Sequence, residues 1–547
     1  MSASIWNPGS NINVSDSSGY VESIFRYLSA TKIAAIQAYS YSQNVTDEIA
    51  TAIAQGFEDG AVRLFFPAGG YIADIDFIVK ALGSSVLTEY RGIPITFIGA
   101  GNGEPFVTSR SLNRGTLIAA ASANTPALRI RQDSGNPTGT SGTIRISGIR
   151  FESTTTSDPV VDIESFCGQS LLDNCTIYQL STGAGLKIGQ MSTGAINQVH
   201  VLNTDQFVIG GTKTSKGVEI LQPDNNNGLP YLHKVTSRGW EYAYVLGNGV
   251  NRTYIPKLDD CEASCVSYGV LINPFTSQAV IDTLYCEGVS ETCIVDRGED
   301  TKVTNSQFLI GYKVGIDGDY TSSGSAYGRV YSNNYLEAND DHNVDMVRVT
   351  SSGTSGGPGT VVTHNRFLYS GSGAVTVNGL VISGSDPRVD YSGNTFLPRG
   401  DWLGAGKKIL DNSTSSDGTT GSGIYGLGVA ESTSRAVEVQ QLGRGALNLA
   451  VESTVISSVS AGVATLSGLS IHTVTFGAAT NITSFASANL PDKTFSIHIT
   501  NGNATLKQGA LLKLSGSVDY TPTAAGSFHT FQVKPGGMCY EIARIAY

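Results

Sequence analysis

The sequence predicts an all-β chain that is mostly a solenoid of stacked coils, with a short helical cap before it and an antiparallel β-sandwich after it. Short β-branched apolar runs alternate with Gly, Asn, Asp and Ser turns over more than three hundred residues. Within this stretch one phrase recurs, in which Asn or Asp precedes an aromatic or apolar residue. A different strand pattern begins near residue 431. Together these observations divide the chain into a stub, a solenoid, a linker and a sandwich.

The N-terminal stretch, residues 1–42, is polar and rich in glycine and serine, and we interpret it as a stub. It contains one helical stretch, expected over 21–39. A second helix is expected over 46–57, where Thr46 can cap it and apolar side chains recur at helical spacing. Those side chains are Ile49, Ile53 and Phe57. We expect this helix to cap the first coil of the solenoid.

The solenoid is predicted over residues 43–412 from the spacing of the recurring phrase. Matched positions are separated by 23, 23, 27, 32 and 29 residues, and they are Glu262, Tyr285, Phe308, Tyr335, Phe367 and Phe396. A degenerate repeat of this length, with two or three short strands in each copy, is typical of a solenoid. A series of β-sandwiches would instead show strands every 8 to 12 residues or so, without the phrase.

Asparagine suits the turns of such a solenoid. Its side chain tolerates left-handed backbone and can bond to the coils above and below. Because one coil cannot bury its apolar face alone, the coils must stack around a shared core. The longer insertions, at 225–230 and 351–359, are expected on one rim, where they would wall a groove.

The C-terminal part is predicted as a separate domain. Residues 413–430 are rich in Ser, Thr, Gly and Asp and are interpreted as a linker. Residues 431–547 show short strands between regular turns, which predicts an antiparallel β-sandwich. Its expected role is trimerisation or carbohydrate binding.

Composition excludes several classes of protein. Hydrophobic residues make up 40%, enough for a large core, so global disorder is excluded. No run of about 18 apolar residues occurs, so no membrane span is expected. The formal net charge of −11 argues against nucleic acid as a partner. The first thirty or so residues lack the features of a secretory signal peptide.

The seven cysteines are predicted to be buried and reduced. Their number is odd, and their spacing fits neither a disulfide framework nor a zinc site. No metal and no cofactor are therefore expected.

Two segments carry a resemblance to a known family. Val45 to Ala54, followed by Arg63-Leu-Phe-Phe-Pro-Ala-Gly-Gly-Tyr71, resembles the opening of the pectate-lyase-3-like right-handed β-helices. The polar stub and the ending Gly536-Gly-Met-Cys-Tyr-Glu-Ile-Ala-Arg544 resemble bacteriophage tailspike depolymerases. The resemblance implies that the solenoid is a right-handed parallel β-helix.

The resemblance also implies a function and partners. It implies a homotrimer on the virion that cleaves a bacterial surface polysaccharide, such as capsule, exopolysaccharide or O-antigen. The stub would then attach the spike to a phage tail or baseplate protein. In the same reading, the C-terminal sandwich caps the last coil and holds the trimer.

Acidic and aromatic residues concentrate between Tyr231 and Glu287. Hydrolysis of a glycan needs two carboxylates, and sugar rings are bound by aromatic side chains. The candidate catalytic residues are Glu241, Asp282, Glu287 and Glu337, and the candidate substrate-binding residues are His233, Arg238, Trp240, Tyr242 and Tyr285. Asp259 and Asp282 are expected in one column on adjacent coils. Glu287 and Glu337 are expected in another, two coils and about 10 Å apart.

Three functions remain open besides hydrolysis by two carboxylates, which is slightly favoured. A lyase would use a base and a cation to eliminate from a uronate, and it could draw on the tyrosines and on His233, Lys234, Arg238 and Arg252. An adhesin would bind glycan without cutting it. A secreted pectinase-like enzyme fits the absence of a signal peptide poorly. The candidate acids also have plain structural interpretations as turn or surface residues, and Trp240 as packing at a trimer seam.

Overall fold

The computed structural model describes much of the chain. The described residues are 14–16, 19–79, 92–104, 114–132, 143–203, 213–221, 229–309, 311–319, 328–351, 360–385, 389–391, 393–397, 406–414, 424–425, 451–456, 463–465, 471–476, 479–486, 494–523, 526–534 and 538–546. They form two compact units, the first holding Met1–Pro387, Thr395–Pro398 and Trp402–Thr420, and the second the remainder. The predicted linker, 413–430, lies mostly outside the described residues.

The first unit begins with a small helical cap. Its elements are the 3-10 helix Ile24–Tyr27, α1 (Ala30–Gln37) and α2 (Thr46–Glu58). The predicted apolar stripe of α2 is buried as expected. Thr46, however, does not cap α2, because it is the first helical residue and its hydroxyl accepts from the Asp74 backbone N–H at 3.0 Å. The Asn44 side chain instead accepts from the Thr46 backbone N–H.

Three long sheets follow, which we call sheets I, II and III. Sheet I runs in the order β1 (Val14–Asp16), β2 (Gly19–Ser23), β3 (Val62–Phe66), β6 (Ile95–Gly99), β9 (Ile144–Ser147), β12 (Leu171–Asp173), β15 (Ala195–Asn197), β18 (Tyr231–His233), β22 (Lys257–Asp259), β26 (Val280–Asp282), β29 (Lys302–Thr304), β32 (Val330–Ser332) and β35 (Thr360–Thr363). Further along the chain, β38 (Val389–Asp390) pairs with β41 (Ile424–Tyr425).

Sheet II contains β4 (Gly69–Ile72), β7 (Thr116–Ala119), β10 (Ile149–Ser153), β13 (Thr176–Gln179), β16 (His200–Asn203), β19 (Thr236–Arg238), β23 (Glu262–Ser264), β27 (Tyr285–Glu287), β30 (Gln307–Phe308), β33 (Tyr335–Ala338), β36 (Arg366–Tyr369) and β39 (Thr395–Leu397). Sheet III contains β5 (Ile75–Ile78), β8 (Leu128–Arg131), β11 (Val161–Cys167), β14 (Leu186–Ser192), β17 (Lys216–Ile220), β20 (Tyr242–Leu246), β24 (Tyr268–Ile272), β28 (Thr292–Asp296), β31 (Val314–Asp319), β34 (Val344–Ser351), β37 (Val377–Ser385) and β40 (Ile409–Thr414). A short side pair joins β21 (Thr253–Tyr254) to β25 (Thr276–Ser277).

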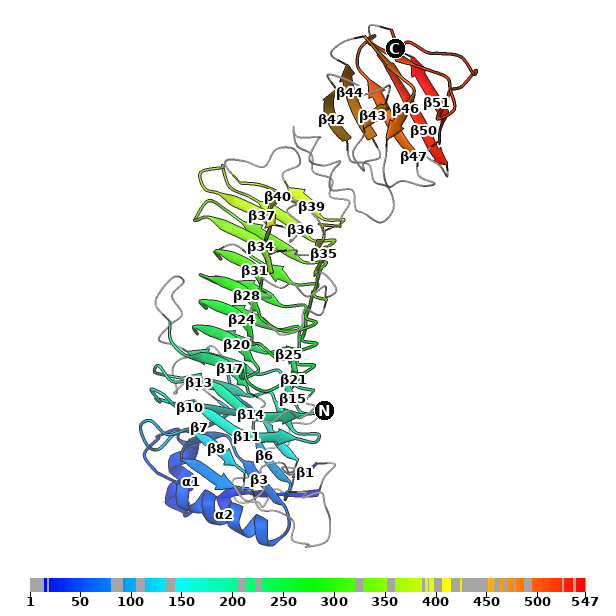
Figure 1. Ribbon diagram of the computed structural model, residues 1–547. Helices are drawn as coiled ribbons and strands as arrows, with labels where there is room; N and C mark the ends of the chain where they lie inside the picture. The colour runs from blue at the N-terminus through cyan, green and yellow to red at the C-terminus, as the bar shows by residue number, and fades with distance from the viewer. Residues whose placement is uncertain are drawn as a thin grey trace, which may run out of the picture. The chain divides into compact units, whose positions relative to one another are not determined.

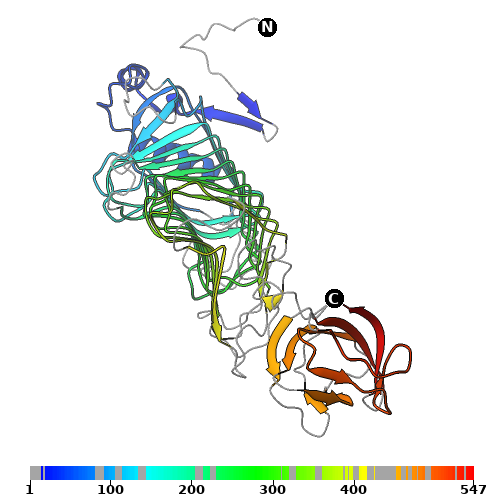
Figure 2. The same ribbon diagram turned by 90° about the horizontal axis from the view of Figure 1, so that it is seen from above.

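Each coil contributes one strand to each sheet, in the order I, II, III. One coil, for example, is β18, β19 and β20, and the next is β22, β23 and β24. Neighbouring strands of sheets II and III are parallel throughout, as in β19 with β23 and β20 with β24. The coils stack from the helical cap to β40 (Figure 1) and lie over one another when seen from above (Figure 2). The first unit is therefore a right-handed parallel β-helix, and the predicted fold class is confirmed.

One left-handed non-glycine residue joins sheet I to sheet II in each of eight described coils. These residues, with φ between 48° and 58°, are Asn174, Gln198, Lys234, Asp260, Thr283, Asn305, Asn333 and His364. Non-glycine residues rarely adopt this backbone, and asparagine and aspartate tolerate it best. The Asn or Asp of the recurring phrase therefore marks this turn. Stacking of the amides is also observed, since Asn334 Nδ2 donates to Asn365 Oδ1 at 3.0 Å.

The register shows that the matched positions used to count the repeat mix two columns. Glu262, Tyr285 and Tyr335 lie in one outward column, whose members on β30 and β36 are Gln307 and Arg366. The matched residues Phe308 and Phe367 instead point inward, and so does Phe396 on β39. The count is thus off by one residue at three positions, because an aromatic residue occupies the outward position in some coils and the inward position in others.

The second unit contains a mixed sheet, whereas the prediction was antiparallel. Its order is β42 (Val451–Ile456), β44 (Ile471–Phe476), β47 (Thr494–Ile499), β50 (Ser527–Lys534), β51 (Met538–Ala546) and β49 (Leu512–Lys513). Two short pairs accompany it, β43 (Val463–Thr465) with β46 (Ser484–Ala486), and β45 (Thr480–Ile482) with β48 (Ala504–Leu506). Among the described strand pairs of this unit, β47–β50 and β50–β51 are antiparallel. The β42–β44 and β44–β47 pairs are parallel, because intervening strands provide crossover connections.

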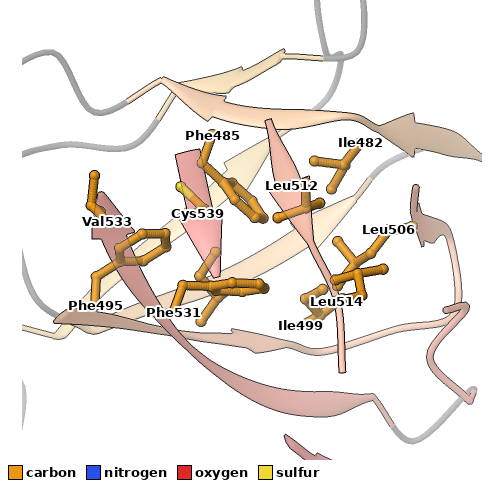
Figure 3. Close-up of a cluster of buried hydrophobic side chains, with 12 residues drawn as sticks. Ile482, Phe485, Phe495, Ile499, Leu506, Leu512, Leu514, Phe531, Val533 and Cys539 are labelled. Carbon is orange, nitrogen blue, oxygen red and sulfur yellow. The ribbon is translucent and has the colours of Figure 1, made fainter. Parts of the chain in front are cut away.

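The core of the second unit is aromatic and aliphatic. Phe485, Phe495 and Phe531 lie together beside Leu512 and Cys539 (Figure 3). The Phe495 and Phe531 ring centroids are 5.5 Å apart. Among the described residues of both units, no helix is long and apolar enough to cross a bilayer.

Candidate functional site

The outer face of sheet II carries a Tyr-x-Glu arrangement twice. On β27 the Tyr285 hydroxyl donates to Glu287 Oε2 at 3.0 Å. On β33 the Tyr335 hydroxyl donates to Glu337 Oε2 at 2.8 Å. The residue between each pair is buried in the core, so strand alternation places tyrosine and glutamate side by side on the outer face. Burial, and then the hydrogen bond to the carboxylate, raise the pKa of both tyrosines, which therefore stay donors at neutral pH.

The two pairs lie two coils apart. Gln307 of β30 is in register with both Tyr285 and Tyr335. At about 4.8 Å per coil, the backbones that carry the two glutamates are about 10 Å apart. The predicted register of Glu287 and Glu337 is therefore confirmed. Glu287 is exposed and Glu337 is half-buried, so both carboxylates are open to a ligand.

Polar residues extend this face on both sides. Toward the N-terminus, Arg238 Nε donates to Ser264 Oγ at 2.9 Å, and Ser264 Oγ donates to Glu262 Oε1 at 2.7 Å. Toward the C-terminus, the Arg366 guanidinium lies 5.6 Å from the centre of the Tyr335 ring. We call the whole set the sheet II ladder. Its members are Arg238, Glu262, Ser264, Tyr285, Glu287, Tyr335, Glu337 and Arg366.

Asp282 lies on sheet I and not on the ladder. It shares a column with Asp259, as predicted. Its Oδ1 accepts from Thr304 Oγ1 at 2.9 Å and from Asn305 Nδ2 at 2.8 Å. The turn at Thr283 separates it from Tyr285. The structure thus divides the four predicted catalytic acids, and only Glu287 and Glu337 share a face.

A second cluster surrounds Asp259 on sheet I. Its Oδ2 accepts from the Tyr231 hydroxyl at 2.7 Å and lies 3.4 Å from Lys257 Nζ and 3.5 Å from His233 Nδ1. The Tyr231 and His233 rings are stacked, with centroids 5.9 Å apart. Burial opposes ionisation of Asp259, but the bond from Tyr231 and the charge of Lys257 outweigh it and lower the pKa of this carboxyl. Burial and Asp259 raise the pKa of Tyr231 to about 12.

Trp240 is a core residue, which corrects its predicted role in stacking on sugars. Its exposed fraction is 0%, and its Nε1 donates to the Val201 carbonyl at 3.1 Å. It fills space left by small residues of the neighbouring coils. A Cβ added to Gly217 would lie 2.8 Å from the indole, and one added to Gly185 would lie 3.1 Å from it. A ligand on the surface cannot reach this ring.

Glu241 and Tyr242 lie at the corner where the chain passes from sheet II to sheet III. Tyr242 stacks on Tyr268 of the next coil, with ring centroids 4.7 Å apart and planes at 13°. Both tyrosines are half-buried. On the same corner, Lys313 Nζ pairs with Glu291 Oε1 at 2.6 Å. Glu241 and Tyr242 thus border the ladder and are not part of it.

The cations considered for a lyase are dispersed. Lys234 is the exposed left-handed turn residue of its coil, with a φ of 53°. Arg252 NH2 lies 3.8 Å from Glu299 Oε2. His233 belongs to the Asp259 cluster, and Arg238 is held by Ser264.

Several members of these clusters were not among the predicted site residues. Tyr335, Glu262 and Arg366 complete the ladder, while Lys257 and Tyr231 complete the Asp259 cluster. The sequence contains Tyr-x-Glu at both 285–287 and 335–337, and this repeat could have identified Tyr335 as a site residue. The other four acquire their neighbours only through the pairing of coils.

Most of the insertions at 225–230 and 351–359, expected to wall a groove, lies outside the described residues. Among the residues that the structure describes, no group of three or more His, Cys, Asp or Glu side chains could hold a metal ion.

Comparison with known proteins finds only distant structural similarity. No protein-family model matches the chain, and no curated protein matches it in sequence. A crystal structure of PfbA, a surface adhesin of Streptococcus pneumoniae, is similar at 12% identity and a TM-score of 0.41, over 73% of this chain and 93% of that one. A second PfbA structure gives 12% identity and a TM-score of 0.31, over 72% and 100%. With scores this low, the fold assignment rests on the strand pairing itself.

Proposed function

We propose that the chain binds a bacterial surface polysaccharide along the sheet II ladder and hydrolyses it between Glu287 and Glu337. The observation that carries this proposal is the pair of hydrogen-bonded Tyr–Glu units on one open face, two coils apart. Hydrolysis of a glycosidic bond needs two carboxyl groups at a limited separation. No other two of the predicted catalytic acids share a face of a sheet.

The separation between Glu287 and Glu337 favours hydrolysis with inversion of the anomeric configuration over hydrolysis with retention. Retaining enzymes hold their carboxyl groups roughly 5 Å apart, whereas inverting enzymes leave roughly 6.5 to 9.5 Å for a water molecule. The backbones of Glu287 and Glu337 are about 10 Å apart, and their flexible side chains can shorten this distance. One group protonates the oxygen of the leaving sugar while the other activates the attacking water. Tyr285 and Tyr335 orient the carboxylates from the same strands.

The length of the ladder suits a polymer. From β19 to β36 it crosses six strands, or about 24 Å at about 4.8 Å per step. Side chains that recur at the coil spacing can contact successive sugars of a chain. The arginines near its two ends, Arg238 and Arg366, add hydrogen-bond donors to a face that is otherwise dominated by carboxylates.

We extend the proposal to a phage tailspike depolymerase, on the resemblance of the polar stub and of the ending Gly536 to Arg544. In this reading the protein is a homotrimer of the virion that acts at the bacterial cell surface. Residues 1–42 join it to a tail or baseplate protein. The substrate is a capsule, an exopolysaccharide or an O-antigen.

A second candidate, a polysaccharide lyase, draws on the Asp259 cluster. His233 could remove a proton next to a uronate carboxylate, and Lys257 could neutralise that carboxylate. The close approach of His233 and Lys257 to Asp259 is the observation in its favour.

A panel assay separates these functions. Purified protein is incubated with bacterial capsular and O-antigen polysaccharides, and both reducing ends and the ultraviolet absorbance of unsaturated uronates are followed. We expect reducing ends without absorbance. Absorbance that is lost in His233→Ala would overturn the hydrolase in favour of the lyase. A glycan that is bound but never cut would make the protein an adhesin.

A further inference from the structure

The second unit buries a chain of serine, histidine and glutamate. Ser527 Oγ lies 2.6 Å from His529 Nε2, and His529 Nδ1 lies 2.6 Å from Glu541 Oε1. Ser527 and His529 stand on the same face of β50, and Glu541 comes from the adjacent strand β51. The exposed fraction of both Ser527 and His529 is 0%. A nucleophile, a base and an orienting carboxylate linked in this order make up an acyl-transfer triad.

The hydrogen bonds fix the direction of proton transfer. Burial opposes ionisation of Glu541, but bonds from His529, Arg544 and the Ser515 backbone outweigh it and lower the pKa of Glu541 to about 2. The ionised carboxylate can only accept, so His529 Nδ1 is the donor in that bond. In the neutral imidazole Nε2 then carries the lone pair, and Ser527 Oγ–H donates to it. Ser527 is therefore placed to lose its proton to His529.

Burial restricts what Ser527 can attack. A dissolved substrate cannot reach a hydroxyl with no exposed surface. The carbonyl carbon of Gly526 is different, because attack on it by the hydroxyl of the next residue closes a five-membered ring within the chain. Gly526 has a φ of 90°, and a Cβ there would lie 2.2 Å from the Ile499 carbonyl oxygen. Its N–H donates to the Thr523 carbonyl at 2.9 Å, which holds the peptide at the entrance to β50.

We propose that Ser527 cleaves the peptide bond that precedes it. Ser527 Oγ bonds to the Gly526 carbonyl carbon and passes its proton to His529 Nε2. The Gly526–Ser527 C–N bond then breaks, and His529 returns the proton to the departing nitrogen. The product is an ester between Gly526 and Ser527 Oγ. Breaking the C–N bond frees the chain end at Ser527 to move and admit water, which hydrolyses this ester, restores the hydroxyl and leaves a Gly526 carboxylate and a free amine on Ser527.

Cleavage would leave the unit assembled. The released segment, Ser527–Tyr547, has 547 − 526 = 21 residues and contains β50 and β51. β50 pairs with β47 over six residues, and β51 pairs with β49. The nicked protein would thus keep its fold and separate only under denaturing conditions. Neither step depends on the proposed glycan cleavage.

Intact-mass spectrometry of the full chain under denaturing conditions tests the proposal. Protein incubated for several days at neutral pH should yield two species, residues 1–526 and 527–547. Ser527→Ala should remain whole, while Ser527→Cys should still cleave. His529→Gln should slow cleavage by roughly 100-fold or more. Glu541 is a positioning residue, so Glu541→Asp should restore part of the rate that Glu541→Gln loses.

The matched control is Ser496→Ala. Ser496 lies on β47 of the same sheet and hydrogen-bonds to Thr530 at 3.0 Å, away from the triad. It should cleave like the parent, and near-ultraviolet circular dichroism should show that each variant is folded. A folded parent chain that stays whole would overturn the proposal. So would cleavage that persists in Ser527→Ala or occurs at a different bond.

Discussion

Glu287 and Glu337 of the β-helix differ in their surroundings from Glu541 of the C-terminal unit. In the β-helix, Glu287 and Glu337 each receive one tyrosine bond and face solvent. In the C-terminal unit, Glu541 receives bonds from His529, Arg544 and a backbone N–H, and its side chain is fully buried. In Glu287 and Glu337 carboxylate oxygens remain available to a ligand, whereas in Glu541 both oxygens accept hydrogen bonds from the protein itself. The carboxylates of Glu287 and Glu337 are therefore accessible, whereas the carboxylate of Glu541 is enclosed by its own hydrogen-bond donors.

The difference follows from the backbone of each unit. Glu287 and Glu337 occupy outward positions of sheet II strands, so their carboxylates face away from the core. The polar groups that the β-helix does bury, such as Arg150 with Glu152, are instead paired with one another. The C-terminal sheet lets β50 and β51 contribute polar residues to its interior, provided that they satisfy one another. Variants that disturb each interior separately should therefore affect one unit and spare the other.

The largest effect is expected from Trp240→Ala in the β-helix. It removes a fully buried indole and leaves the Val201 carbonyl without its donor. We expect the β-helix to lose about 3–5 kcal/mol of unfolding free energy, measured by guanidinium denaturation. Trp240→Phe is the control and should cost less. Glycan binding by the folded fraction should be unchanged, and a selective loss of binding would restore the predicted role of Trp240 in sugar stacking.

A smaller, pH-dependent effect is expected from Glu541→Gln in the C-terminal unit. The folded pKa of about 2 lies below the ordinary value of 4.5. The carboxylate therefore stabilises the fold above about pH 4.5, and this contribution is lost as the pH falls toward 2. By linkage the contribution is roughly 3 kcal/mol at neutral pH.

Thermal unfolding across this pH range checks that prediction. Glu541→Gln should be less stable than the parent at neutral pH, and the two should converge at the acidic end. The control is Asp519→Asn, which removes the exposed partner of Lys507 and should change little. A stability difference that is independent of pH would show that ionisation of Glu541 does not matter.

The smallest effect is expected at the left-handed turns of the β-helix. Thr283 has a φ of 56°, a backbone that a β-branched residue adopts only at a cost. Thr283→Asn should therefore stabilise the unit by about 1 kcal/mol, seen as a higher denaturation midpoint. The reverse change at a matched position, Asn333→Thr, should destabilise it by a similar amount. Equal midpoints for all three proteins would mean that this column is unstrained.

The fold was predictable from the sequence where the signal is local. Asn174, Asn305 and Asn333 mark left-handed turns, and these turns reveal the repeat. The inward or outward direction of the following aromatic residue is not local, which explains the error at Phe308 and Phe367. The parallel pairs of the C-terminal sheet were missed for a similar reason. Turn spacing locates strands and says nothing about which strands become neighbours.

The candidate site was predictable only in part. The register of Glu287 and Glu337 follows from counting, and the structure agrees. Trp240 was wrongly predicted to be exposed, because its burial depends on Gly185 and Gly217, which lie in earlier coils of the β-helix. Asp282 lies close to Glu287 in sequence, but it belongs to sheet I and Glu287 belongs to sheet II. The triad of the second unit joins residues from two strands that only tertiary structure brings together.

The central claim is that Glu287 and Glu337 form one hydrolytic pair. The most direct measurement is the rate of reducing-end formation by Glu287→Gln and Glu337→Gln on a glycan that the parent cuts, with binding affinity measured in parallel. Glu291→Gln, at the neighbouring corner, is the matched control. We predict that each member of the pair loses roughly 1,000-fold or more in rate and keeps its affinity within about threefold, while the control cuts normally. Cleavage by both amide variants at the rate of the control would contradict the claim.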